Sequence, residues 1–177
     1  LIAEYFEREV IPRLNACDTD RLVQLSICSS FCVPLASAVL GELPRHAKAA
    51  QLIAHLVHQD LFIYPVVSQN LERWFRLHPL LRDFLATRFQ ALPRDLQQRL
   101  HARAADWFES AGLLDETVRH RIDADQVERA VALVEVYAQE MQVRGDFQNI
   151  AAALRRLPPQ ALSRRLPLRL LHGHLQP

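Results

Sequence analysis

The chain has 177 residues, of which 50% are hydrophobic and 23% are charged, so it is long enough to bury a core in one or two units. Its 21 basic and 20 acidic residues leave a formal net charge of +1, which excludes a global field that would attract nucleic acid or anionic lipid. No uncharged apolar run reaches about 18 residues, and Glu4, Glu7, Arg8 and Glu9 stand where a secretory signal would be apolar, so no membrane segment is expected.

The first quarter of the sequence has the spacing of short helices. Apolar residues recur at helical intervals from Ile2 to Leu14, and Pro12 is expected to kink or end that helix. A second helix is expected to begin at Asp18 or Thr19 as its N-cap. The expected helices are therefore 2–14, 19–29, 34–40, closed by Gly41, and 44–59.

A different pattern follows, which is typical of strands. The segment 61–67 contains Pro65 and many branched or aromatic residues, and this composition favours an edge strand. Residues 68–70 form a turn signal, and 73–77 alternate as a returning strand. Helices, one hairpin and a further helix make a winged-helix pattern, in which we expect Trp74 and Phe84 to pack into the core.

The second half is expected to be helical again. An apolar stripe starts after Pro93 and ends at Gly112, and a shorter helix spans about 115–124. Asp125 and Glu128 resemble a capping box that opens a helix ending near Gly145, and another helix precedes Pro158. The interval between the two glycines favours a tetratricopeptide-like array over an ordinary helix bundle. We therefore predict a mainly α protein: a winged-helix-like domain with one β-hairpin over 1–92, then antiparallel helix hairpins over 93–177.

His78 is the strongest candidate for a functional residue. It follows the returning strand and precedes Pro79, at the expected start of an amphipathic helix. An imidazole beside the free N–H groups and positive end of a helix suits an anionic phosphate. The alternative, which the spacing alone favours, is a histidine that only caps its own helix.

Other reactive residues have simpler interpretations. His55 and His58 have a spacing seen in metal sites, but only Asp60 lies near them in sequence, so we expect a helix face and no metal. Cys17, Cys28 and Cys32 are an odd set, which favours reduced thiols in the cytoplasm. No nucleophile, base and orienting group converge in sequence, so no catalytic residue and no enzyme activity are expected.

The charge pattern does not favour contact with DNA. Arginines gather near the C-terminus, and we interpret them as a solvated helix face or an interdomain contact; they are Arg155, Arg156, Arg164, Arg165 and Arg169. The wing carries two basic residues, Arg73 and Arg76, beside the acidic Glu72. The candidate recognition helix carries only two basic residues, Arg45 and Lys48, so neither element has the basic surface that DNA contact requires.

Several sequence segments, taken in chain order, resemble those of MalT-like, LuxR-family regulators of the STAND ATPase class. Thr117 is a departure, because members usually have alanine there. The segments that carry the resemblance are Val23–Ser29, the helix closed by Gly41, Leu61–Pro65, the aromatic hairpin, His78-Pro79-Leu80, Ala104–Phe108, Gly112–His120 and Glu128–Ala130.

The resemblance implies a regulatory piece of an ATP-dependent, inducer-responsive transcription activator. A nucleotide domain would precede Leu1, the helical sensor would continue beyond Pro177, and a LuxR-type helix-turn-helix would close the longer protein. ATP or ADP would bind that longer protein, because this chain has no Gly-x-x-x-x-Gly-Lys-Ser/Thr loop and needs no cofactor itself. In the STAND class a winged-helix histidine, often in a Met-His-Asp motif, faces the ADP phosphate, and Leu77-His78-Pro79 matches only the histidine.

The resemblance also implies the partners. They are the nucleotide domain of the same longer chain, a small-molecule or protein inducer, further copies of the longer protein, and DNA only through the missing C-terminal domain; no membrane is involved. The alternative function is a stand-alone winged-helix DNA-binding protein with a helical dimerisation region.

Overall fold

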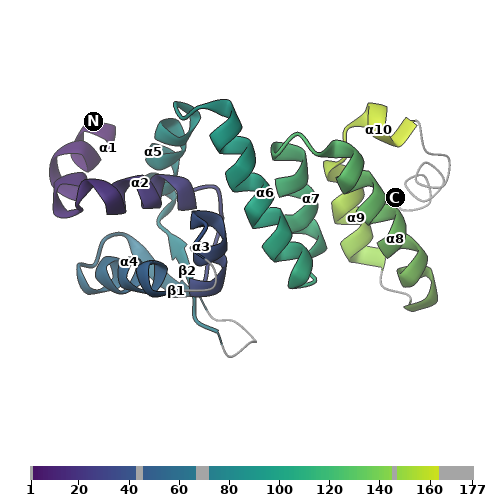
Figure 1. Ribbon diagram of the computed structural model, residues 1–177, viewed down its shortest axis with the longest axis horizontal. Helices are drawn as coiled ribbons and strands as arrows, with labels where there is room; N and C mark the ends of the chain where they lie inside the picture. The colour runs from purple at the N-terminus through teal and green to yellow at the C-terminus, as the bar shows by residue number, and fades with distance from the viewer. Residues whose placement is uncertain (1, 43–45, 67–71, 145–146, 164–177) are drawn as a thin grey trace. The chain divides into compact units, whose positions relative to one another are not determined.

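Helices make up most of this chain, and a single pair of strands interrupts them in the part that the computed structural model describes (Figure 1). The described residues are 2–42, 46–66, 72–144 and 147–163. They fall into two units, residues 1–100 and 101–177, and each unit is described by itself. The expected fold class, mainly α with one antiparallel hairpin, is confirmed. None of the described helices is long and apolar enough to cross a bilayer.

The N-terminal segment changes its helical form near Pro12, as the sequence predicts. Helix α1 (Ile2–Tyr5) continues as a π-helical turn (Phe6–Val10) and then as a 3-10 turn (Ile11–Arg13). Pro12 lies in the first turn of the 3-10 segment, where its missing N–H costs no hydrogen bond. Phe6 and Val10 from the π-helical turn are buried in unit 1.

Helix α2 (Ala16–Leu25) begins earlier than expected. Its N-cap is Asn15, whose side-chain oxygen accepts a hydrogen bond from the Asp18 backbone N–H at 2.8 Å. The expected cap at Asp18 or Thr19 is therefore wrong, because both residues already lie within the helix. The helix also ends at Leu25, short of the expected Ser29.

Helices α3 (Val33–Leu40) and α4 (Ala47–His58) precede the strands. Gly41 closes α3 with a φ of 73°, a left-handed conformation that glycine adopts without a Cβ clash, so the predicted cap is confirmed. The expected start of α4 at Pro44 lies outside the described residues.

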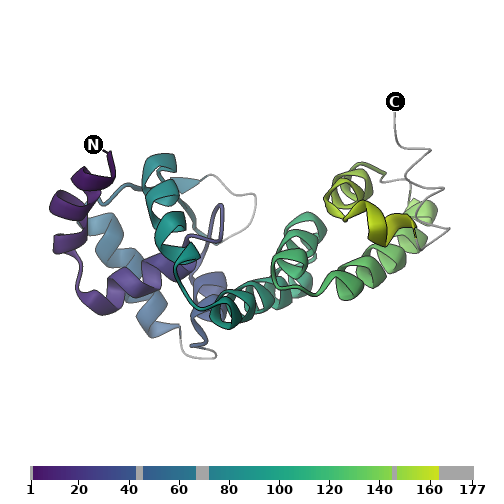
Figure 2. The same ribbon diagram turned by 90° about the horizontal axis from the view of Figure 1, so that it is seen from above.

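The wing is an antiparallel pair, β1 (Ile63–Val66) and β2 (Trp74–Leu77), with Ile63 opposite Leu77 and Val66 opposite Trp74. Phe31, before α3, adds a bridge: its backbone N–H and C=O both bond to Phe75, at 2.8 Å each. The expected turn at 68–70 lies outside the described residues. Helix α5 (Pro79–Gln90) follows β2 after a single residue, His78, and is drawn in teal in Figure 2.

The hairpin contributes different core residues from those expected. Ile63 and Leu77, which face each other, are buried, whereas Trp74 and Phe84 are only half-buried. Alternation along β2 explains the position of Trp74, because Trp74 and the buried Leu77 point to opposite faces of the strand, whereas Phe84 lies on helix α5. Trp74 therefore contributes less to the core than its size suggests.

Unit 2 is built from helices joined by short turns. Helix α6 (Arg94–Ser110) runs through the boundary of the two units, and α7 (Leu114–Asp123), α8 (Val127–Arg144), α9 (Phe147–Arg156) and α10 (Pro159–Ser163) follow. Gly112 has a φ of 72° after α6, as predicted, and Gly145 lies outside the described residues. Asp125 has a φ of 61°, so it lies in the left-handed turn after α7 and is not the expected N-cap.

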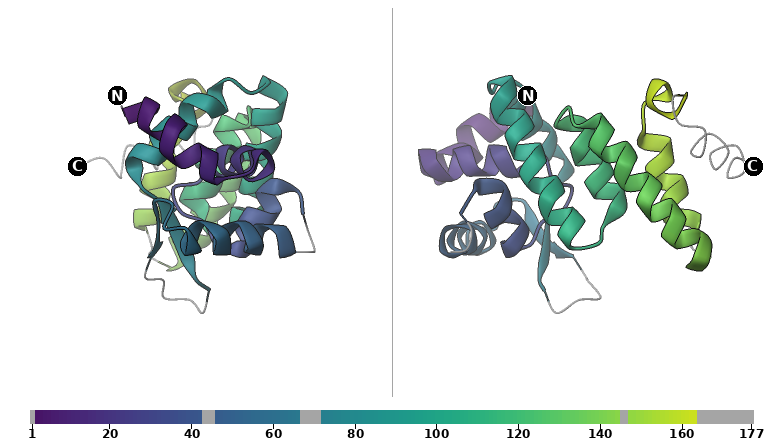
Figure 3. Two further views of the ribbon diagram at one scale, coloured as in Figure 1. Left: turned by 90° about the vertical axis from the view of Figure 1, so that its left-hand side faces the viewer. Right: turned by 45° about the vertical axis from the view of Figure 1, so that its right-hand side comes forward.

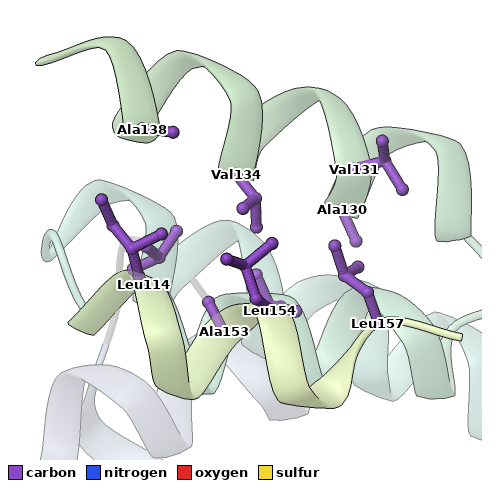
Figure 4. Close-up of a cluster of buried hydrophobic side chains, with 10 residues drawn as sticks. Leu114, Ala130, Val131, Val134, Ala138, Ala153, Leu154 and Leu157 are labelled. Carbon is purple, nitrogen blue, oxygen red and sulfur yellow. The ribbon is translucent and has the colours of Figure 1, made fainter. Parts of the chain in front are cut away.

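Helices α7, α8 and α9 pack side by side around one apolar core (Figure 3). Small residues on α8 and α9 let these helices approach closely, and leucines fill the remaining space (Figure 4). The buried residues are Leu114, Val118, Ala130, Val131, Val134, Ala138, Ile150, Ala153, Leu154 and Leu157. Assignment of these helices to a tetratricopeptide-like array stays a prediction.

Candidate functional site

The histidine singled out in the sequence lies between β2 and α5 as the N-cap of the helix. Its backbone is extended, with φ of −56° and ψ of 137°, and Pro79 follows in the first turn. The His78 Nδ1 atom accepts a hydrogen bond from the Leu80 backbone N–H at 3.3 Å. The capping role that the spacing favours is therefore present, and it satisfies one N–H that the helix leaves unpaired.

This capping contact determines which nitrogen of His78 can bind a ligand. Because Nδ1 accepts from Leu80, the neutral ring carries its proton on Nε2. As a whole residue, His78 is half-buried. A cap and a phosphate donor are thus compatible roles for the two nitrogens.

Phe62 supports the imidazole of His78. The His78 backbone N–H donates to the Phe62 carbonyl at 2.7 Å, and the Phe62 ring meets the imidazole edge-on at 5.9 Å between centroids. Phe62 has a φ of 55°, which is uncommon for a residue with a Cβ and marks a tight turn before β1. Sequence reasoning missed this contact, because nothing in the local pattern indicates a left-handed phenylalanine.

An aromatic cluster lies behind Phe62, and Phe6 is at its centre. The Phe6 ring contacts Phe62 at 5.4 Å and Phe84 at 5.3 Å between centroids. Arg88 covers the outer face of Phe84 at 5.0 Å and forms an ion pair with Glu7 at 2.5 Å. The cluster connects α5 to the N-terminal segment through Phe84 and Arg88, which lie one turn apart on the helix that His78 caps.

The candidate metal residues are not brought together. His55 is half-buried, with Nδ1 3.6 Å from the Asp18 carboxylate, while His58 is exposed. Among the residues that the structure describes, no group of three or more histidine, cysteine or acidic side chains could hold a metal ion.

The cysteines are free thiols, of which Cys28 and Cys32 are buried and Cys17 is exposed. Burial, together with the nearby Glu72 carboxylate, raises the pKa of the Cys32 thiol to about 12. A thiol that stays protonated is a poor nucleophile and a poor metal ligand. Cys28 and Cys32 are therefore small residues of the core of unit 1.

An apolar groove of about 660 Å³ opens on unit 1 between α3, α4 and the wing. Three residues one helical turn apart on α4 form one wall, namely Ala50, Ala54 and Val57, and Val57 is 48% exposed. His58, Glu72 and Arg73 also line it. The wall that α4 contributes to this groove is therefore mainly apolar and carries no lysine or arginine.

The C-terminal arginines are only partly within the described residues. Arg155 and Arg156 are exposed on α9, and Arg156 forms a bidentate ion pair with Asp115 of α7 at 2.6 and 2.7 Å. Arg164, Arg165 and Arg169 lie outside the described part. Arg156 thus contributes to the packing of two helices of its own unit.

Helices α2 to α4, the antiparallel wing and the capped helix α5 define a winged-helix domain. Residues 7–100, more than half of the chain, match the MalT winged helix domain, and the chain belongs to this family. The matched family is a winged-helix domain and not a catalytic one.

The similarity to known proteins extends beyond the wing. The chain is 28% identical over 170 residues to the serine/threonine-protein kinase PknK of Mycobacterium tuberculosis, and equally to PknK of Mycobacterium bovis. It is 29% identical over 173 residues to the HTH-type transcriptional regulator MalT of Vibrio cholerae. These alignments cover 96% and 97% of this chain but only 15% of PknK and 18% of MalT. The chain thus spans less than a fifth of the length of these relatives.

Proposed function

We propose that this chain is the regulatory winged helix of a nucleotide-dependent switch protein, joined to the first helices of its sensor. The observation that carries the proposal is the geometry of His78, whose Nδ1 caps α5 and whose Nε2–H is left to donate. In the longer protein, His78 Nε2 would donate to a phosphate of ADP held by the nucleotide domain and so favour the resting state. The names of the relatives, a transcriptional regulator and a protein kinase, fit a module that serves different outputs.

The switch works through a difference in affinity between two states. A ligand shifts an equilibrium only by its differential interaction with the two states, so the His78 contact must be made in the resting state and lost in the active one. Release of the contact would let ATP and inducer favour the active state and self-association. The regulated output, such as transcription, would come from other parts of the longer protein.

The apolar face of α4 argues against the alternative, DNA binding by this domain. In a winged helix that binds DNA, the helix before the wing presents base-reading and phosphate-binding side chains. Within its described residues, α4 carries Lys48 as its only lysine or arginine, and the residues that it contributes to the groove are apolar except for His58. We therefore assign no DNA contact to this surface.

The isolated chain is expected not to bind ATP or ADP tightly, because its sequence holds no phosphate-cradling loop and His78 supplies a single donor. Calorimetric titration with each nucleotide tests this expectation. Micromolar affinity in the isolated chain would contradict the divided site, in which the nucleotide domain provides most of the binding energy.

His78→Ala in the longer protein is expected to lower the affinity for ADP and to shift the switch toward its active state. A charge-assisted hydrogen bond of this kind contributes about 1.5–3 kcal/mol, which corresponds to a roughly tenfold or larger change in the equilibrium. ADP titration and the inducer concentration needed for half-activation measure the two effects.

The matched variant His78→Asn separates the cap from the phosphate contact. Asparagine is a good N-cap but does not place a donor where Nε2 lies. The variant should therefore preserve the stability of α5 and still have a lower affinity for ADP. If His78→Asn binds ADP as the wild type does, His78 serves only as a cap and the proposal fails. His58→Ala, at an exposed histidine of the same unit, controls for loss of an imidazole.

A further inference from the structure

Two buried imidazoles meet between α6 and α7 in unit 2. The Nδ1 atoms of His101 and His120 are 2.9 Å apart, and the two residues are 9% and 0% exposed. The His120 ring also stacks on Phe108 of α6, at 5.3 Å between centroids and 15° between planes. Nitrogens at this distance must share one proton, because two N–H groups or two lone pairs would repel each other.

The neighbour of His120 decides where that proton lies. Arg119 Nη2 is 2.8 Å from His120 Nε2, and a guanidinium only donates, so Nε2 accepts. Neutral His120 therefore carries its proton on Nδ1 and donates it to Nδ1 of His101. His101 in turn is neutral, with its proton on Nε2.

His101 has a second partner within reach. An Asp123 carboxylate oxygen lies 3.6 Å from the same Nδ1 atom of His101. When His101 gains a proton, Nδ1 changes from acceptor to donor, so it can no longer accept from His120. The protonated Nδ1 can donate to Asp123 instead, which leaves the buried Nδ1–H of His120 without its acceptor.

The charges around the pair determine which ring is protonated first. Asp123, Glu116 and Arg119 of α7 face it, Arg156 reaches it from α9, and Phe108 of α6 brings no charge. Burial, Arg119, His101 and Arg156 lower the pKa of His120 to about 2. Burial and Arg119 also lower the pKa of His101, but Asp123 opposes this shift and has no counterpart among the causes at His120, so His101 takes up the first proton.

We propose that the His101–His120 contact is a proton-operated switch within the α6–α7 hairpin. On acidification, His101 exchanges His120 for Asp123, and α7 loses a buried hydrogen bond to α6. The argument rests on the contacts of unit 2 alone and is independent of the role assigned to His78.

The direction of the pH effect follows from linkage. Both histidines have a lower pKa in the folded chain than the ordinary value of 6.5, so the unfolded chain binds more protons below that pH. Their stabilising contribution is fully present above pH 6.5 and is lost as the pH falls. Each histidine that stays neutral in the fold can raise the unfolding constant by up to roughly tenfold per pH unit below 6.5.

The first test uses nitrogen-15 NMR of the imidazoles in the intact chain, which distinguishes the two neutral tautomers directly. At pH 7.5 we expect the proton of His120 on Nδ1 and that of His101 on Nε2. As the pH falls from 7.5, His101 should titrate before His120, and the Nδ1–H signal of His120 should change with it. The opposite tautomers, or a His101 that titrates without any change at His120, would overturn the proposal.

The second test compares His101→Asn with the wild type in urea unfolding at pH 7.5 and pH 5. The Asn side-chain oxygen can accept from His120 Nδ1–H but does not titrate, so the variant should match the wild type within a few-fold at pH 7.5 and lose less stability at pH 5. His58→Asn, at an exposed site in unit 1, should keep the wild-type pH dependence. Equal pH dependence of His101→Asn and wild type would contradict the switch.

Discussion

The double substitution Asp106→Ala with Glu109→Ala is expected to destabilise unit 2 by about 3–5 kcal/mol, because it leaves a buried charge without a counter-charge. Arg121 is only 1% exposed, and its Nη2 donates to Asp106 at 2.5 Å and Glu109 at 2.6 Å. Its Nη1 donates to Gln126 at 2.8 Å. In the described part of the chain, Nε of Arg121 has no acceptor, so the two carboxylates carry most of the compensation.

The measurement should isolate unit 2 from unit 1. The chain has two tryptophans, Trp74 in unit 1 and Trp107 in unit 2, so a Trp74→Phe background lets Trp107 fluorescence report urea unfolding of unit 2. Arg129→Ala is the matched control. Arg129 lies 3.7 Å from Asp106 and 3.6 Å from Glu109 but is 57% exposed, so its loss should cost less than about 1 kcal/mol.

The comparison of the two arginines separates burial from charge. If Arg129→Ala destabilises unit 2 as much as the double carboxylate variant, the ion pairs act through net charge and not through the buried guanidinium. If neither change has an effect, the fold must compensate Arg121 without these carboxylates.

Much of the fold follows from local pattern. Apolar spacing predicts the helices, and the positive φ of Gly41 and Gly112 confirms two predicted helix ends. The local signals fail where a competing residue has the same chemistry: Asn15 caps α2 three residues before the expected Asp18. They fail again at Asp125, whose short polar side chain suits an N-cap and a left-handed turn equally well.

The sequence predicts only part of the candidate site. The strand, His78 and Pro79 indicate a capped helix, because all of these signals are local. The partner of His78 is not local: Phe62 precedes β1, His78 follows β2, and the pairing of the two strands brings the two rings together. The His101–His120 pair and the Arg121 cluster likewise join residues of different helices, and a single sequence contains no pattern that pairs them.

Phe6→Ala is expected to destabilise unit 1 by about 3–5 kcal/mol, the usual cost of deleting a buried aromatic ring. Phe6 is 1% exposed, and its ring contacts Phe62 and Phe84, so its removal opens a cavity between the N-terminal segment and α5. Tyr5→Ala is the control: Tyr5 touches Phe62 too, at 6.3 Å, but is 49% exposed and should cost much less. Trp74 fluorescence in a Trp107→Phe background measures both variants. Equal effects of the two would mean that the N-terminal segment does not pack on α5, and the support inferred for Phe62 and His78 would be lost with it.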